Sequence, residues 1–407
     1  MVTIKKLSNG MPVIYERVSS LRSVSLGLCV KVGSRDEPES KSGISHFVEH
    51  MLFKGTTNRS YREISELIDG IGGELNAFTS RETTVLHTTV LDKNIEIAID
   101  LLSDIVLNST FKEEEVEKEK NVIIEEIKMY EDLPEDQVHE SNIGNALKRT
   151  RLSSPIIGNE EKVRNINRED LVEWFNEHYT SNKMFLSIVG HFDIVRVHSL
   201  LEGHFCKLSR VSKSIEAKGA FELSVDNKEV TKKTNQVHIC VNTKGLSHPS
   251  KDIFKLYIAS NIVGGGSSSR LFQRIREERG LAYSIYSYLS CYRDGGLFTT
   301  YIGTSKGNYK EALDITLEEY KKISQGGVSE KELERSKNQI ISSLVLDLEG
   351  SKSQMFRNMN LYFSTEEVKP FNKMIKQIQR ITLRDVSTFC NEHFDDKYYS
   401  FTALGDL

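Results

Sequence analysis

Residues 166–179, INREDLVEWFNEHY, and residues 381–394, ITLRDVSTFCNEHF, are two versions of one sequence. They align without a gap, and the alignment extends to a glycine at residues 190 and 405. The offset is 215 residues throughout, far longer than the period of roughly 20–50 residues that solenoid repeats have. The sequence therefore predicts two copies of one domain. Six identical pairs support this alignment: Ile166 and Ile381, Asp170 and Asp385, Asn176 and Asn391, Glu177 and Glu392, His178 and His393, Gly190 and Gly405.

The first copy contains signals for both strands and helices. Apolar residues alternate from Val24 to Val32, which predicts a strand with one buried face. Asn9-Gly10 lies between two short alternating segments, a strong signal for a type I′ β-hairpin. The other predicted elements are an antiparallel pair at 74–79 and 83–90 and helices at 61–71, 94–107, 113–130 and 170–178. We predict an α+β fold with two homologous domains, each an antiparallel-rich sheet covered by helices, related by internal duplication.

The division between the domains is expected in a polar stretch rich in Lys and Ser. We predict an N-terminal domain at 1–210, a linker at 211–235 and a C-terminal homologous domain at 236–407. His178 and His393 recur at equivalent places, after the helical pattern of each copy. That recurrence indicates a shared structural role, such as closing a helix, and argues against metal binding by either residue.

The composition excludes several classes of protein. The chain has 54 Lys and Arg against 58 Asp and Glu, so no basic field points to nucleic acid or an anionic membrane. No apolar stretch approaches the length that spans a bilayer, and the first residues contain neither a signal-peptide core nor an Arg-rich transit sequence. Five scattered cysteines form no close pair, which favours a reducing compartment. We expect a soluble cytoplasmic protein that binds neither nucleic acid nor membrane.

Residues 46–50, His-Phe-Val-Glu-His, carry the clearest chemical signal. No proline interrupts the stretch that follows, so a helix is the natural local state and places His46 and His50 on one face. Two neutral imidazoles can bind zinc, and Glu49 beside them can act as the base of a metal-assisted hydrolysis. This H-x-x-E-H pattern is the inverzincin motif. The alternative is a pair of surface or capping histidines, so a third ligand is needed to decide.

Six residues could supply the third ligand: Glu74, Glu82, His87, Glu119, Glu125 and Glu126. The helix predicted at 113–130 has an apolar stripe, and Glu119 and Glu126 fall on one line at its margin. Glu125 points to the solvent side of the same helix. Two aligned carboxylates suit a metal ligand and its supporting partner, although both can also be solvated boundary residues. The helical wheel therefore favours Glu119 and Glu126 without separating them.

The stretch HFVEHMLFKGT and the glutamate that ends EKNVIIEE resemble the pitrilysin family of zinc peptidases. In that family, two histidines and the downstream glutamate bind zinc, and the motif glutamate is the base. The resemblance implies one zinc ion per chain on His46, His50 and Glu126, with Glu49 as the catalytic base and Glu119 as a second acid of the catalytic site. It covers essentially the whole chain. Two similar halves resemble the processing-peptidase branch, which includes bacterial homologues of the mitochondrial processing peptidase.

The stretch GGELNAFTSRE also matches the family. There the strand is an exposed edge, and the substrate peptide adds to it as another strand. The resemblance therefore implies that Asn76, Ala77 and Phe78 bind substrate.

The second half contains a match to the family's other functional motif, an arginine and a tyrosine seven residues apart in RIREERGLAYSIYSY. The match implies that Arg276 and Tyr283 bind substrate, because a guanidinium can hold a peptide carbonyl and a phenol can stabilise an oxyanion. The alternative is a basic helix face followed by an aromatic strand. The glycines at 264–266 lack the Gly-Lys-Ser/Thr of a phosphate loop. They predict a flexible turn before a helix at 269–279.

These features predict a zinc-dependent endopeptidase that hydrolyses peptides or unfolded segments in an enclosed chamber, with Glu49 as the base on zinc-bound water. The alternative is a non-catalytic family subunit that acts as a scaffold or partner, although such subunits usually lose some of the site residues. In long single-chain relatives, the zinc lies in the first of four similar domains and the Arg/Tyr pair in the fourth. A chain of two domains is therefore expected to form a homodimer with a shared site, and a heterodimer with a related subunit stays open. The sequence names neither the physiological substrate nor the cleavage preference.

Overall fold

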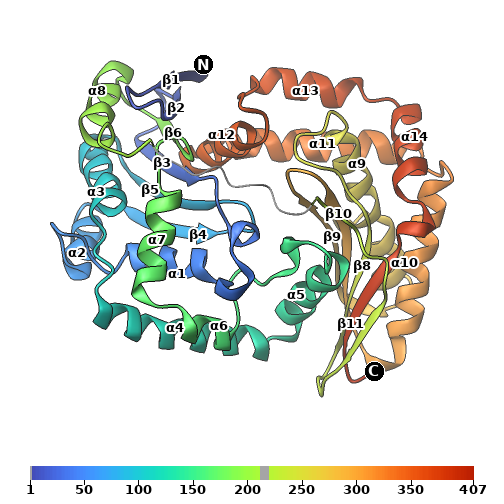
Figure 1. Ribbon diagram of the computed structural model, residues 1–407. Helices are drawn as coiled ribbons and strands as arrows, with labels where there is room; N and C mark the ends of the chain where they lie inside the picture. Colours follow the sequence, from blue (N-terminus) through green and yellow to red (C-terminus); the bar gives the residue numbers. More distant parts are fainter. Residues whose placement is uncertain (1, 211–219) are drawn as a thin grey trace. The chain divides into compact units, whose positions relative to one another are not determined.

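The computed structural model describes residues 2–210 and 220–407 (Figure 1). The chain divides into two compact units. Unit 1 takes its described residues from 1–127, 154–218 and 346–370, and unit 2 from 128–153, 219–345 and 371–407. In the part of the chain that is described, each unit contains one sheet with helices packed on it. The predicted α+β fold with two similar domains is confirmed.

The sheet of unit 1 has the strand order β1-β2-β6-β3-β5-β4. Neighbouring strands are antiparallel except β2 and β6, which run parallel. The predicted hairpin joins the first two strands, and Gly10 in its turn has a φ of +87°, a conformation that favours glycine. The strands are β1 (Val2–Lys6), β2 (Pro12–Arg17), β3 (Ser23–Val30), β4 (Glu74–Thr79), β5 (Thr84–Leu91) and β6 (Met184–Gly190).

Both faces of this sheet are buried at its central strands, as alternate residues of β6 show. Met184, Leu186 and Ile188 belong to the larger core of unit 1, whereas Phe185 and Val189 belong to a smaller core. Because side chains alternate along a strand, the two cores lie on opposite faces. Helices of the N-terminal half contribute to the larger core: α1 (Ile44–Leu52), α2 (Tyr61–Gly70), α3 (Ile95–Asn108), α4 (Glu113–Asp132), α6 (Glu160–Asn165), α7 (Arg168–His178) and α8 (Ile194–Phe205).

The smaller core is closed by a helix from the other half of the chain. This helix, α12 (Ser351–Thr365), packs on β3 and β6 (Figure 1). Its Met355 and Met359 lie over Gly27 of β3, where a Cβ atom would meet their sulfur atoms at 2.2 and 2.4 Å. Arg357 of α12 also donates a hydrogen bond to Glu16 of β2 at 2.8 Å. The absence of a side chain at residue 27 thus lets the helix approach the sheet closely.

Unit 2 repeats this arrangement with the strand order β7-β11-β8-β10-β9. Strands β11 and β7 run parallel, and the other neighbours are antiparallel. Helices α9, α10 and α14 build the larger core, and α5 (Pro134–Ala146), from the N-terminal half, packs on β8 and β11. The other elements are β7 (Lys228–Thr231), β8 (Val237–Lys244), β9 (Ala282–Cys291), β10 (Gly296–Thr304), β11 (Ser400–Gly405), α9 (Ile253–Gly264), α10 (Tyr309–Ser324), α11 (Glu330–Leu346), α13 (Phe371–Arg380) and α14 (Leu383–His393).

Helices α5 and α12 occupy equivalent places in the repeat. Adding the offset of 215 to the bounds of α5, 134 and 146, gives 349 and 361, against 351 and 365 for α12. Each follows a long helix of its own half, α4 or α11. Each half of the chain therefore sends the same helix to the sheet of the other half.

The two recurring histidines end their helices, α7 at His178 and α14 at His393, as their shared structural role predicts. His178 Nδ1 lies 2.9 Å from Lys183 Nζ, and His393 Nδ1 donates to the Phe389 carbonyl at 3.0 Å. The domain limits expected from the sequence, 1–210 and 236–407, stay a prediction. Residues 211–219 of the expected linker lie outside the described residues, and the rest of that stretch contains β7. Among the described helices, none combines the length and apolar character that crossing a membrane requires.

Candidate metal centre and active site

Helix α1 carries the histidine pair, and its start is fixed by tight backbone packing. Gly43 precedes the first residue with a φ of +96°, and a Cβ atom there would meet the Ile157 carbonyl oxygen at 2.8 Å. All residues of α1 except His50 are buried, against β4, β5 and α7. The helix therefore has little freedom to turn or slide, and the direction of His46 is set with it.

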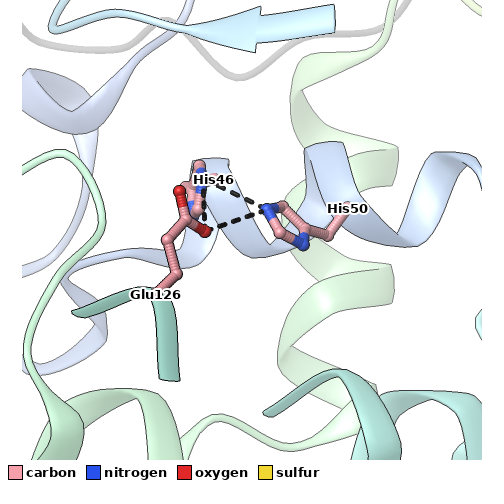
Figure 2. Close-up of side chains that lie close together, drawn as sticks. All are labelled: His46, His50 and Glu126. Atoms are coloured by element: carbon pink, nitrogen blue, oxygen red, sulfur yellow. Dashed lines mark hydrogen bonds and ion pairs between the residues drawn. The ribbon is translucent and has the colours of Figure 1, made fainter. Parts of the chain in front are cut away.

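His46 and His50 of α1 lie beside Glu126 of α4 (Figure 2). His46 Nε2 is 3.2 Å from His50 Nε2 and 3.7 Å from Glu126 Oε2, and His50 Nε2 is 3.5 Å from the same oxygen. Two ligands that are each about 2.1 Å from a tetrahedral zinc ion lie about 3.4 Å apart. The three atoms therefore fit one face of a tetrahedron around a single ion. Among the described residues, these three form a group of His and Glu whose ligand atoms all lie within 4.8 Å of one another.

The structure separates Glu126 from the other candidates for a third ligand. Glu125, its neighbour on α4, is exposed, as the helical wheel predicts. Glu119 is buried and bonds to the far side of the His50 ring. The remaining three make other contacts: Glu74 with Lys352, Glu82 with Arg35, and His87 with the rings of Phe78 and Phe356.

Glu119 orients His50. Its Oε1 lies 2.8 Å from His50 Nδ1, and its Oε2 lies 2.6 Å from Lys54 Nζ. Burial would raise the pKa of Glu119, but the hydrogen bonds from His50 and Lys54 outweigh it and lower the pKa. An ionised Glu119 can only accept a hydrogen bond, so it favours the tautomer of His50 that has its proton on Nδ1. In that tautomer the lone pair of the ring lies on Nε2, the atom that faces Glu126.

His46 is held in its neutral form. Burial, together with the nearby His50, lowers its pKa to about 3. A neutral imidazole offers the lone pair that a metal needs. Its Nδ1 is buried without a hydrogen-bond partner among the described residues, and its Nε2 faces the other two ligand atoms.

Glu49 is a buried carboxylate on the same helix. Thr79 Oγ1, at the end of β4, donates to Glu49 Oε2 at 2.5 Å. Burial raises the pKa of Glu49, and the hydrogen bond from Thr79 opposes that shift. A carboxylate with a raised pKa accepts a proton more readily. Glu49 thus has both the orientation and the basicity that a general base needs.

Strand β4 forms an edge of the sheet, and among the described strands it pairs with β5 alone. Asn76 and Phe78 are exposed and Ala77 is half-buried, in the alternation of a strand with one packed face. The Phe78 ring lies 5.8 Å from that of Phe356 on α12. The three residues implied to bind substrate therefore lie on an open edge, and Thr79 at the end of that edge contacts the carboxylate on α1.

Arg276 and Tyr283 lie together in unit 2. Arg276 Nη1 donates to the Tyr283 carbonyl at 2.9 Å, and its guanidinium carbon is 4.3 Å from the centre of the Tyr283 ring. Tyr283 is 77% exposed. Most of the helix predicted at 269–279 is a π-helical turn at Phe272–Glu277, a rare geometry that is frequent at functional sites.

Comparisons with known proteins identify the family. Residues 12–160 match the family model described as Insulinase (Peptidase family M16), and residues 165–340 match the Peptidase M16 inactive domain. The chain is 38% identical over 397 residues to the Bacillus subtilis protein named uncharacterized zinc protease YmxG, with 96% of this chain and 95% of the relative covered. The chain belongs to peptidase family M16. The resemblance to pitrilysin-type zinc peptidases is thereby confirmed.

Further M16 relatives and solved structures agree with this assignment. A Streptomyces coelicolor protein, also named an uncharacterized zinc protease, is 33% identical over 393 residues, which are 93% of this chain and 84% of the relative. The crystal structure of a protease from Helicobacter pylori superposes with a TM-score of 0.91 at 21% identity, covering 100% and 99% of the two chains. A chain of complex III2 from Candida albicans, with Inz-5 bound, gives 0.87 at 20% identity, covering 100% and 96%. These structural likenesses show the M16 fold.

Unit 2 has no counterpart of the histidine pair in the equivalent helix. Helix α9 follows β8 in unit 2 as α1 follows β3 in unit 1, and α9 contains no His, Cys, Asp or Glu. It therefore offers a metal neither an imidazole nor a carboxylate. The family model's description as an inactive domain agrees with this absence.

Two polar residues of the M16 site did not emerge from the sequence patterns. Lys54 follows His50 by four residues, and this helical spacing was a signal that it could reach the same side. Thr79 gave no such signal, because its bond to Glu49 depends on how β4 packs against α1.

Proposed function

We propose that this M16 protein is a zinc-dependent endopeptidase that cleaves peptides or unfolded polypeptide segments. The observation that carries the proposal is a buried, oriented carboxylate, Glu49, on the helix whose histidines help to form a three-ligand zinc geometry. Two imidazoles and one carboxylate are the donor set of zinc sites that keep a position open for chemistry. The names of the relatives as zinc proteases support the same metal.

His46, His50 and Glu126 would hold one zinc ion per chain. When bound, zinc supplies Lewis-acid polarisation of the scissile carbonyl and makes the attacking water more acidic. Glu49 takes a proton from that water and afterwards gives it to the leaving amine. Thr79 keeps the Glu49 carboxylate in one orientation throughout.

The open edge of β4 supports a preference for extended substrates. A peptide that adds to this edge as a further strand is bound through its main chain, which gives affinity without demanding one sequence. Asn76, Ala77 and Phe78 lie along the edge, and Thr79 leads to the carboxylate that would act as base. A folded protein seldom presents such a free segment, so the enzyme would act on peptides and unfolded chains inside an enclosed chamber.

Arg276 and Tyr283 would complete the substrate site from a second protomer. A guanidinium can hold a peptide carbonyl, and the exposed phenol of Tyr283 can donate to an oxyanion. The pair lies on unit 2, whose helix α9 offers no such ligands. A homodimer would therefore contain two sites, each built from both chains.

Cleavage of an unstructured, internally quenched peptide tests the proposal. We expect the purified protein to cleave it, a zinc chelator to abolish the activity, and zinc but not magnesium to restore it. A stably folded protein serves as the control and should stay intact under the same conditions. If the zinc-loaded protein cleaves none of a diverse set of unstructured peptides, the non-catalytic alternative, a scaffold or partner subunit, is favoured.

A further inference from the structure

A carboxylate outside the motif holds the start of helix α1. Glu37 is only 4% exposed. Its Oε2 accepts a hydrogen bond from the Gly43 N–H at 2.7 Å, and its Oε1 accepts one from the Ser45 N–H at 2.8 Å. The first N–H groups of a helix have no partner within the helix, so side-chain oxygens that accept from them satisfy groups that would otherwise stay unpaired. Glu37 therefore serves as the N-terminal cap of α1.

No residue at the start of the helix could do this locally. The usual caps are Ser, Thr, Asp and Asn, whose side chains bond back to the first turn. Residue 43 is a glycine in the left-handed region, and a side chain there would collide with the Ile157 carbonyl oxygen. The structure shows no side-chain cap from this position. The cap must come from elsewhere, and Glu37 supplies it from six residues earlier.

The backbone just before Glu37 is fixed on the turn between β4 and β5. The Ser34 N–H donates to the Ser80 carbonyl at 3.2 Å, and the Arg35 N–H donates to the Arg81 carbonyl at 2.9 Å. A Cβ atom on Gly33 would meet the Ser80 carbonyl oxygen at 2.3 Å, so the two segments touch through their main chains. The cap is therefore attached to the hairpin that ends in the edge strand.

A buried ion pair strengthens this attachment. Arg35 Nη1 lies 2.6 Å from Glu82 Oε1, and both side chains are less than 10% exposed. The same hairpin contributes Thr79, which holds Glu49. Helix α1 is thus fixed to one hairpin at two points, through Glu37 at its start and through Glu49 in its middle.

We propose that Glu37 is a positioning residue of the M16 site, which sets the first turn of α1 relative to edge strand β4. His46 is the next residue after Ser45, so a shift of this turn would move its Nε2 away from His50 and Glu126. The inference rests on the proposed function for its effect on catalysis. Its effect on the affinity for zinc does not depend on catalysis.

The test compares Glu37→Gln with Glu39→Gln. The first variant keeps the shape of the side chain but turns an amide N–H₂ toward one of the two backbone N–H groups. Glu39 lies in the same loop and is exposed, so the same substitution there leaves the contacts with α1 untouched. For each protein, zinc affinity is measured by competition with a chromophoric chelator, thermal stability by circular dichroism, and kcat and KM on the zinc-saturated enzyme.

We expect Glu37→Gln to bind zinc roughly 10–100-fold more weakly, as loss of a residue that orients metal ligands typically does. Its kcat should fall by a similar factor while KM stays within about twofold, because misplaced groups slow the reaction without removing the edge that binds substrate. Glu39→Gln should match the wild type. A Glu37→Gln protein that is less stable but keeps wild-type zinc affinity and kcat would overturn the proposal.

Two further results keep the test decisive. If Glu37→Gln does not fold, Glu37→Asp, which keeps the carboxyl group but shortens the reach, should shift zinc affinity and kcat in the same direction by a smaller factor. Values equal to those of Glu39→Gln would then count against the proposal. If the wild type binds zinc but cleaves no peptide, the proposed function fails, and the zinc affinities alone still decide the role of Glu37.

Discussion

A series of side-chain contacts that begins at Lys54 orients the ring of His50. The Lys54 ammonium pairs with Glu119, Glu119 bonds to Nδ1 of His50, and Nε2 of His50 faces Glu126 at 3.5 Å. Each of these contacts orients the next group. The ring nitrogen that His50 offers to a metal is therefore decided by two residues that need not touch the metal.

The neighbours Glu126 and Glu125 provide a matched test of the third ligand. Glu126→Gln should lose most of the zinc, because a neutral amide binds this ion much more weakly than a carboxylate does. Glu125→Gln, an identical change on the exposed side of α4, should keep it. Zinc per chain is measured by atomic emission after gel filtration. Equal metal content in the two variants would rule out Glu126 as a ligand.

Regular spacing made part of the site predictable at this scale. A helix places His46 and His50 on one face, and the wheel of the acidic helix favours Glu119 and Glu126 over Glu125. Glu37 and Thr79 could not be predicted in this way. Both reach α1 through tertiary contacts, and their separations from their partners, six residues or more, follow no helical or strand period.

Among the elements, α5 and α12 were predictable only in part. An amphipathic pattern shows that a helix has a buried face, but it does not show which sheet the face covers. A glycine inside a strand, such as Gly27, indicates a close approach without naming the approaching element. The exchange of the two helices between the halves therefore became visible only in the folded chain.

The packing of α12 on β3 gives a prediction about stability. Gly27→Val should lower the free energy of unfolding by about 1–3 kcal/mol, because its side chain overlaps Met355. Met355→Ala alone should also destabilise, by about 2–5 kcal/mol, through the cavity it leaves. The destabilisation of the double variant should be at least about 1 kcal/mol smaller than the sum of the two single losses. The shortened side chain at residue 355 leaves room for the larger one at residue 27.

Urea titration monitored by circular dichroism measures these free energies. Met374→Ala, a buried methionine on α13 in unit 2, is the control partner for Gly27→Val and should give additive losses. Additive losses for Gly27→Val with Met355→Ala would contradict the contact between α12 and the sheet.

The first turn of α11 carries an ion pair whose effect depends on pH. Arg270 donates two bonds to Glu332, at 2.7 and 2.9 Å, and the Ser329 N–H donates a third at 2.9 Å. Burial would raise the pKa of Glu332, but these bonds outweigh it and lower the pKa to about 2. Because an unfolded glutamate has a pKa of about 4.3, the stabilisation is full above that value and is lost as the pH falls toward 2.

Glu332→Gln should therefore lower the free energy of unfolding by about 1–3 kcal/mol at pH 7, and by much less at pH 2.5. Glu330→Gln, an exposed change in the same turn, should have little effect at either pH. Unfolding is followed by urea titration at both values. A loss for Glu332→Gln that does not vary with pH would contradict the assignment of the lowered pKa.

On the scale of the whole molecule, the repeat was predictable because identical residues recur at a constant offset. That alignment covers residues 166–190 and 381–405 alone, so it did not show whether the second copy has a histidine pair of its own. The folded chain shows that α9, the helix that follows β8 as α1 follows β3, contains no histidine. The proposed zinc ligands and the Arg276–Tyr283 pair thus lie in different units.

If two chains share each site, two inactive variants should complement each other. A mixed dimer of Glu49→Gln and Tyr283→Phe has one site with both defects and one site with none. We expect activity to return on subunit exchange, to at most half that of a wild-type dimer. Exchange is followed by energy transfer between labelled chains, and activity by the quenched peptide. Demonstrated exchange without recovery would mean that each chain builds its own site.

The central claim, that this M16 protein hydrolyses peptides with Glu49 as the base, is tested most directly by Glu49→Gln. Zinc content, the circular dichroism spectrum and the rate of peptide cleavage are measured on the same preparation. Zinc and fold should match the wild type, since Glu49 is not among the three proposed ligands. Cleavage should fall by about 10²–10⁴-fold or more, as removal of a positioned base does. A zinc-loaded variant that cleaves the peptide at close to the wild-type rate would contradict the account.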